Sequence, residues 1–267
     1  MNWTRVSAIV VRQLYLYRGS PQRILPMFAW VAIDILLWGY ITRYLSQISH
    51  SGVNLVATML GAVLFWDFVT RIMQGVTMAF FEDVWSRNFL NFFASPLRTS
   101  EYLSGLVLIG VTTSLLGLAA MLALAWAAFG LSFLSFGAAL APFLAVLFLS
   151  GIALGIMGAG IVLRLGPASE WLIWPIPTVV SPFVGVFYPV AVLPGWMQLI
   201  SKTLPPSYVF ESMRAVIAGK AVPWDQLAIG GALSVGYVLL ACAFFASVYR
   251  YAIRTGLIAR YSAESVT

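Results

Sequence analysis

Long apolar stretches separated by short polar ones dominate the chain, and they predict an all-α membrane protein. Each stretch is about as long as the roughly 20 residues that a helix needs to cross the hydrocarbon core of a bilayer. We expect six transmembrane helices, at about residues 24–41, 53–81, 102–129, 137–163, 171–192 and 226–249. The second is longer than a bilayer requires, so it should tilt or project into water.

The fifth apolar stretch, residues 171–192, is interrupted by prolines at 175, 177, 182 and 189. A regular helix cannot carry so many, because each proline removes a backbone hydrogen bond and clashes with the preceding turn. Breaks of this kind persist inside a membrane only where protein or water satisfies the freed backbone groups. Together with the half-polar residues 193–225, they predict re-entrant helices that dip into the outer leaflet without crossing it. The residues that we assign to these helices are Pro206, Tyr208, Glu211 and Arg214.

The N-terminal residues predict an amphipathic helix that lies in the membrane interface. Apolar residues recur there at steps of three and four, with Arg5 and Arg12 on the opposite side. An ordinary N-terminus with a few anchoring arginines is the alternative, whereas scattered arginines argue against a signal peptide. We therefore expect an interfacial helix at 1–23, a membrane domain at 24–253 and a cytoplasmic tail at 254–267. The apolar positions of the helix are Trp3, Val6, Val10, Leu14 and Tyr17.

Composition and charge agree with a membrane location. Hydrophobic residues make up 61% of the chain and charged residues only 9%, against about 25% charged residues in soluble domains. The net charge of +6 is better explained by loops near anionic headgroups than by nucleic-acid binding. Basic residues are more frequent on the segments that would be inside if the N-terminus is cytoplasmic, which predicts that both termini are cytoplasmic.

The sequence shows no recognisable catalytic or nucleotide-binding motif, so we do not expect an enzyme. A single cysteine, Cys242, and a single histidine, His50, cannot build a disulfide or a metal cluster. Gly219 and Lys220 lack the other positions of a phosphate-binding loop. The least implausible enzyme would be an intramembrane aspartyl hydrolase, but the aspartates lie in no known motif. Any nucleotide must therefore bind to another polypeptide.

Three ionisable residues fall within predicted spans. Asp34 lies in the first, and Asp67 and Arg71 lie four residues apart in the second. Charges at this depth usually face a bundle interior or a water-filled path. Two interpretations stay open: the second-span pair neutralises itself and ties the bundle together, or all three residues line a substrate path. Nearby aromatic rings are either packing and interface anchors or the walls of that path. The residues that we assign to the path are Trp30, Asp34, Trp38, Trp66, Asp67, Arg71, Phe183, Phe187 and Tyr188.

Residues 82–101 read EDVWSRNFLNFFASPLRTSE and predict a short amphipathic cytoplasmic helix that stops at the Ser-Pro pair. Such an aromatic loop suggests a docking site for a partner, although an interfacial hairpin is the alternative. The residues that we assign to this contact are Glu82, Asp83, Trp85, Arg87, Asn88, Phe92, Ser95 and Pro96.

Residues 2–255 resemble the membrane subunits of type-2 ATP-binding-cassette (ABC) exporters. The resemblance rests on FVGVFYPVAVLPGWMQ followed by LPPSYVFESMR, on EDVWSRNFLNFFASPLRTSEYLSG, and on the six-span plan with an interfacial N-terminal helix. Many members carry Gly-Thr and then glutamate before the SPL end of the second motif, where this chain has Arg87-Asn88 and then Leu90. The polar ATPase contacts of those members therefore do not carry over to these positions.

The resemblance implies a function and a set of partners. Two copies of the chain would form a path lined by the first, second and fifth spans, and two ABC ATPase subunits would bind ATP and Mg²⁺. The location would be the bacterial inner membrane and the substrate a glycan, glycolipid or other amphipathic molecule. The alternatives are an ion-coupled secondary transporter or channel that uses Asp34 and Asp67, and a membrane scaffold that transports nothing.

Overall fold

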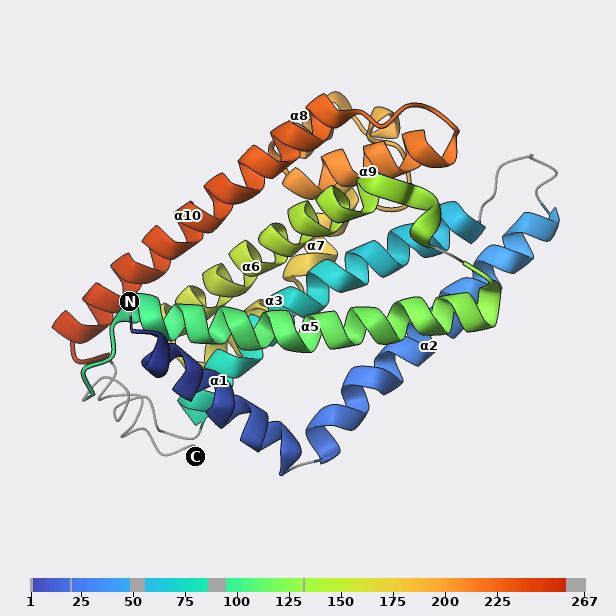
Figure 1. Cartoon of the computed structure of the whole chain (residues 1–267). Coiled ribbons are helices and arrows are strands. Elements are labelled where there is room, and N and C mark those ends of the chain that lie inside the picture. Colours follow the sequence, from blue (N-terminus) through green and yellow to red (C-terminus); the bar gives the residue numbers. More distant parts are fainter. Residues whose placement is uncertain (1, 20, 49–55, 86–94, 132, 258–267) are drawn as a thin grey trace.

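The described part of the chain is helical throughout, which confirms the predicted all-α class (Figure 1). The computed structural model describes residues 2–19, 21–48, 56–85, 95–131 and 133–257. In chain order its elements are α1 (Trp3–Arg18), α2 (Pro21–Ile48), the π-helix η1 (Val56–Leu60), α3 (Gly61–Trp85), α5 (Thr99–Phe129), η2 (Phe133–Ala139), α6 (Leu140–Leu165), η3 (Pro167–Leu172), α7 (Ile176–Val184), η4 (Val190–Val192), α8 (Gly195–Thr203), α9 (Pro205–Ile217) and α10 (Trp224–Arg254). The elements η2, η3 and η4 are 3-10 helices.

Within the described residues, five helical segments are long and apolar enough to cross a membrane. They lie in α2, α3 with part of η1, α5, α6 with the end of η2, and α10, close to five of the six predicted positions. The remaining apolar stretch, residues 171–192, forms the end of η3, then α7 and η4, instead of one long helix. Its prolines interrupt the helix as expected. The count of six spans and the re-entrant path through the outer leaflet stay predictions.

Small residues allow α3, α5 and α6 to pack closely at the centre of the bundle. A Cβ atom added to Gly151 of α6 would lie 2.7 Å from Cβ of Ile72 on α3. One added to Gly75 of α3 would lie 3.0 Å from Cα of Gly110 on α5. Close backbone approach at small residues is a common way for membrane helices to associate, because lipid provides no hydrophobic force between them. α6 in turn lies between α3 and α10 (Figure 1).

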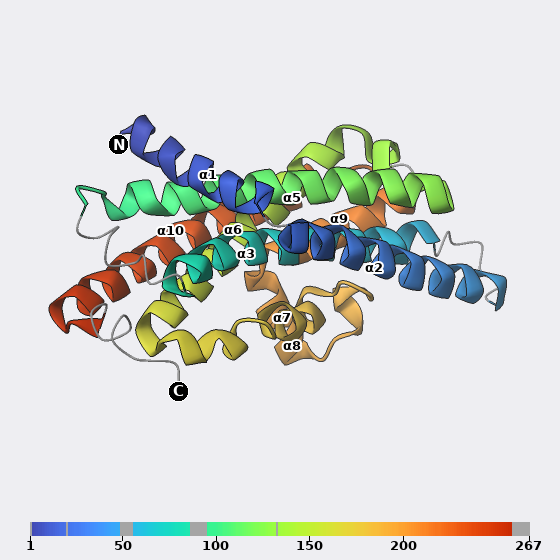
Figure 2. The same ribbon diagram turned by 90° about the horizontal axis from the view of Figure 1, so that it is seen from below.

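Two groups of helices lie on opposite sides of α3 and α6 (Figure 2). α1 and α5 lie on one side, while α7 and α8 lie together on the other. α2 runs along the margin and is buried only on a narrow face, which includes Val31 and Ile35. Its remaining surface is apolar and open, with Trp30 62% and Tyr40 61% exposed. The described residues therefore leave a long apolar face of α2 uncovered.

The N-terminal helix α1 packs across the start of α5, and the predicted apolar face divides in two. Val6 is fully buried, whereas Trp3 and Leu14 are exposed. Ile9 approaches α5 at Gly105, where an added Cβ would lie 2.7 Å from its side chain. The face of α1 that carries Ile9 therefore packs against the protein, and its place in the membrane interface stays a prediction.

Candidate functional site

The structure brings the three intramembrane charges together. On α3, Nε of Arg71 lies 2.6 Å from Oδ2 of Asp67, and both side chains are largely buried. On α2, Asp34 lies near enough to interact electrostatically with both members of this pair. The helical spacing of four residues explains the ion pair, since side chains at that spacing lie on one face. Two carboxylates and one guanidinium thus form a polar cluster between two apolar helices.

Aromatic contacts join α2 and α3 to the segments around α7 and α9. The ring of Trp38 on α2 stacks on Phe187, with the centroids 5.2 Å apart and the planes 16° from parallel. The ring of Trp66 on α3 lies 6.2 Å from that of Phe210 on α9. The first contact joins the predicted first and fifth spans, and the second joins the predicted second span to α9. Trp38, Trp66 and Phe187 of the assigned path residues thus take part in contacts between distant segments.

Other residues assigned to the path have different surroundings. Phe183 packs edge-on against Trp196 of α8, with the centroids 6.1 Å apart. The hydroxyl of Tyr188 donates a hydrogen bond of 3.0 Å to the carbonyl of Pro182 and so closes the turn after α7. Trp30 points its largely exposed ring away from the described core.

An ion pair fastens the helix α9 to the turn that follows α7. Glu211 accepts hydrogen bonds from Arg214 at 2.8 Å and from the backbone N–H of Val190 at 2.7 Å. Arg214 also donates to the carbonyl of Gly185 at 2.8 Å. Gly185 has φ +70°, a left-handed conformation that suits glycine. Glu211 and Arg214, both assigned to the re-entrant helices, therefore hold the turn that follows α7 against α9.

Two other residues assigned to the re-entrant helices stabilise α9 itself. Pro206 is buried in the first turn, where the absent N–H of a proline costs no helical hydrogen bond. The hydroxyl of Tyr208 donates a hydrogen bond of 2.8 Å to the carbonyl of Lys202 in α8.

The segment assigned to partner contact is described at its two ends. Trp85 ends α3 with 51% of its surface exposed and packs on Phe81, with the ring centroids 5.6 Å apart. Glu82 is half-buried, while Ser95 and Pro96 are exposed shortly before α5 begins. Three further assigned residues, Arg87, Asn88 and Phe92, lie outside the described residues. Trp85 is thus the large apolar group that the described part of this segment offers to a partner.

Asp83, which is also assigned to the partner contact, is buried within the described structure. Its side chain is fully buried, accepts a 2.7 Å hydrogen bond from the hydroxyl of Tyr102 and forms an ion pair with Arg12. Arg12 of α1 and Tyr102 of α5 thus supply the hydrogen-bond donors that a buried carboxylate requires. Asp83 therefore joins the end of α3 to α1 and α5, and its contact with a partner stays a prediction.

Helix α1 bridges the two ends of this segment, a feature that the sequence patterns did not reveal. Arg5 donates hydrogen bonds to Glu101, at 3.3 Å, and to the carbonyl of Pro96. The backbone N–H of Asn2 donates to the same carboxylate at 2.7 Å. Arg5 thus binds the start of α5, and Arg12, two helical turns later, binds the end of α3. The sequence does contain one indication of these contacts, because acidic residues stand at both ends of the segment and could pair with the arginines of α1.

Among the residues that the structure describes, no group of three or more His, Cys, Asp or Glu side chains is placed to hold a metal ion.

Comparisons with known proteins bear on the whole arrangement. A family model described as ABC-2 type transporter matches residues 4–218. A search of curated proteins finds no match for the chain. The matched range begins in α1 and ends just after α9, so it includes the polar cluster, the described ends of the cytoplasmic segment and the Glu211–Arg214 pair.

Proposed function

Because the chain belongs to the ABC-2 type transporter family, we propose that it is the membrane subunit of an ATP-driven exporter of a glycan, glycolipid or other amphipathic molecule. Membership supports a permease that spans the membrane and works with ABC ATPase subunits. We further propose two copies of the chain, two ATPase subunits that bind ATP and Mg²⁺, and a location in the bacterial inner membrane with both termini cytoplasmic.

The polar cluster supports a path beside α2 and α3. A carboxylate that faces lipid is costly, so Asp34, Asp67 and Arg71 need either one another or water. Their mutual interactions supply part of that need. Aromatic rings beside them, such as Trp38 and Phe187, suit the apolar faces of sugars and the chains of amphipathic molecules.

The open face of α2 supports a second copy of the chain. Tyr40 and Leu37 of α2 are more than half exposed, and Val179 of α7 is 61% exposed. A twofold interface formed by α2 and α7 would cover these surfaces and enclose the cluster near Asp34, because such an interface uses the same patch on both subunits.

Trp85 is the observation that carries the proposed ATPase contact. It is exposed at the end of α3, while the buried pair of Asp83 and Arg12 fixes the last turn of the same helix to α1. A displacement of this end of α3 would therefore be transmitted to α1 as well. Aromatic anchors of this kind commonly dominate binding between proteins.

The test is co-purification of the chain with its ABC ATPase after co-expression. Trp85→Ala should lower the recovered ATPase by about tenfold or more, since loss of an aromatic hot spot costs about 2 kcal/mol or more. Trp224→Ala is the matched control, because Trp224 is 54% exposed at the far end of the bundle, at the start of α10. Equal ATPase recovery for Trp85→Ala and the wild type would refute the proposed contact.

Energy supply separates this proposal from an ion-coupled transporter. In liposomes that contain the chain and its ATPase, transport should stop on ATP depletion and continue when a protonophore collapses the proton gradient. The ion pair of Asp67 with Arg71 favours this outcome, because that carboxylate already has a cationic partner. Transport that survives ATP depletion but stops with the protonophore would instead support the ion-coupled alternative.

A further inference from the structure

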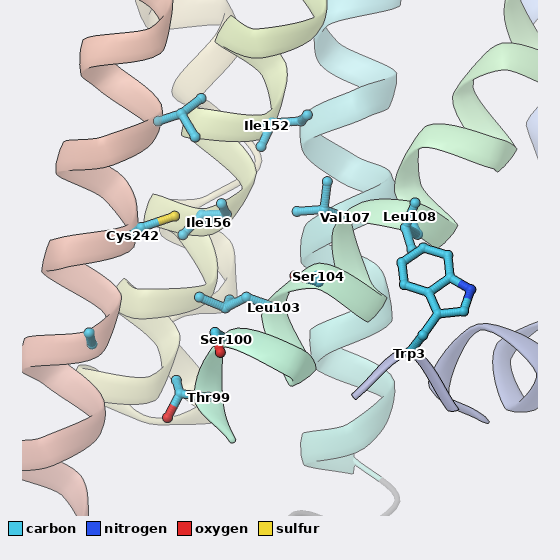
Figure 3. Close-up of a pocket in the computed structure, with 12 residues that line it drawn as sticks. Trp3, Thr99, Ser100, Leu103, Ser104, Val107, Leu108, Ile152, Ile156 and Cys242 are labelled. Atoms are coloured by element: carbon cyan, nitrogen blue, oxygen red, sulfur yellow. The ribbon is translucent and has the colours of Figure 1, made fainter. Parts of the chain in front are cut away.

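A cavity of about 590 Å³ opens between the first half of α5, the middle of α6 and the second half of α10, and Trp3 at the start of α1 also lines it (Figure 3). It lies within the range of about 300–1,000 Å³ that is typical of small-molecule sites. Apolar side chains such as Leu103, Ile152 and Ile156 line most of it. Thr99 and Ser100 lie together at one end (Figure 3). The hydroxyl groups of the lining thus all lie on the first two turns of α5, at Thr99, Ser100 and Ser104, whereas the lining residues of α6 are apolar.

The depth of the cavity matches one leaflet of a bilayer. Its lining on α5 extends from Thr99 to Leu108, which at 1.5 Å per residue is about 14 Å. Half of a hydrocarbon core of about 30 Å is about 15 Å. A chain that enters at the hydroxyl end would therefore reach about the middle of the membrane.

Positive charges flank the hydroxyl end. Arg98 immediately precedes Thr99, and Arg250 lies one helical turn beyond Ala246, which lines the cavity on α10; both arginines are exposed. α10 carries no acidic residue after Asp225, and Glu101 of α5 is buried and bound by Arg5. The charge at this end is therefore positive and open to an anionic group.

We propose that this cavity binds one acyl chain of an anionic phospholipid, with the phosphate near Arg98 and Arg250 and the glycerol near Thr99 and Ser100. A zwitterionic lipid offers the same chain but balances its phosphate with a cation, so it gains less from two arginines. The site is separate from the polar cluster, which lies between α2 and α3. The occupant is a lipid that stays with the protein, distinct from the exported molecule.

Cys242 provides a direct reporter of occupancy. It is the single cysteine of the chain, and its sulfur points into the cavity toward Ile156 (Figure 3). The full chain in dodecyl maltoside is treated with N-ethylmaleimide, and modification is followed by intact mass while dioleoylphosphatidylglycerol or dioleoylphosphatidylcholine is added. Each basic residue near an anionic headgroup strengthens binding about fivefold. Half-protection should therefore need about 25-fold less phosphatidylglycerol than phosphatidylcholine.

Charge variants test which residues recognise the headgroup. The double variant Arg98→Gln and Arg250→Gln should bring the curve of Cys242 protection against phosphatidylglycerol onto that against phosphatidylcholine. The matched control is the double variant Arg43→Gln and Lys220→Gln, which changes exposed charges away from the cavity. It should leave both protection curves unchanged. Equal protection by the two lipids in the wild type, or an unchanged curve in the first variant, would overturn the proposal. So would a thiol that stays unreactive in lipid-free detergent, since a second copy or tight packing would then fill the cavity.

Discussion

Replacing Arg12 with methionine tests whether α1 holds the cytoplasmic end of α3 in place. The change keeps a long side chain but removes the cationic partner of Asp83, whose side chain is fully buried. Breaking a buried ion pair costs about 3–5 kcal/mol, because one charge stays buried without its partner. The side chain of Arg12 is 27% exposed, and Tyr102 still donates its hydrogen bond to Asp83. We therefore expect a loss of about 2–3 kcal/mol.

The assay is thermal unfolding of the purified chain in detergent at one fixed heating rate, because the apparent Tm of an irreversible transition depends on that rate. At about 2–4 °C per kcal/mol, the expected fall in apparent Tm is about 4–12 °C. Arg5→Met is the matched control on the same helix. Arg5 is 37% exposed, and the backbone N–H groups of Asn2 and Arg98 still bind Glu101 without it. Its fall in apparent Tm should be clearly smaller.

A second change separates charge burial from general damage to α1. Asp83→Asn removes the buried charge and keeps an oxygen that accepts the hydrogen bond from Tyr102. In the Arg12→Met background it should recover about 1–3 kcal/mol, the usual coupling between residues in contact. Equal shifts for Arg12→Met and Arg5→Met, or no recovery by Asp83→Asn, would refute the reasoning.

Three other changes test the central packing, the polar cluster and the turn after α7. Gly151→Ala should lower the apparent Tm, because its Cβ meets α3 and overpacking costs about 1–3 kcal/mol. In the same thermal assay Gly236→Ala, with nothing within 4 Å of the added Cβ, should have no harmful effect. Arg71→Ala should lower both apparent Tm and coupled ATP hydrolysis, whereas unchanged values would exclude any role for the ion pair with Asp67. Arg214→Ala should raise the rate of amide hydrogen exchange in the turn after α7 about tenfold, because hydrogen bonds to charged groups contribute about 1.5–3 kcal/mol. An unchanged exchange rate would show that Arg214 does not hold this turn against α9.

The sequence alone predicted the features that depend only on residues close together along the chain. Span length and apolar character identified the helical membrane fold, because a membrane helix satisfies its backbone within its own segment. The prolines between residues 171 and 192 predicted the interruption that appears as α7 and its flanking turns. The i,i+4 spacing of Asp67 and Arg71 predicted their contact, since the helix alone brings them together.

Only the tertiary structure decided which distant residues meet. Arg12 and Asp83 are 71 positions apart, and Arg5 and Glu101 are 96 positions apart. Their pairing depends on how α1 lies across α3 and α5, which no local pattern specifies. The same holds for the cavity beside Cys242, whose walls come from four helices and whose two arginines lie just before α5 and near the end of α10. Apolar periodicity shows that a helix has a face to cover, but the packing of the whole bundle determines what covers it.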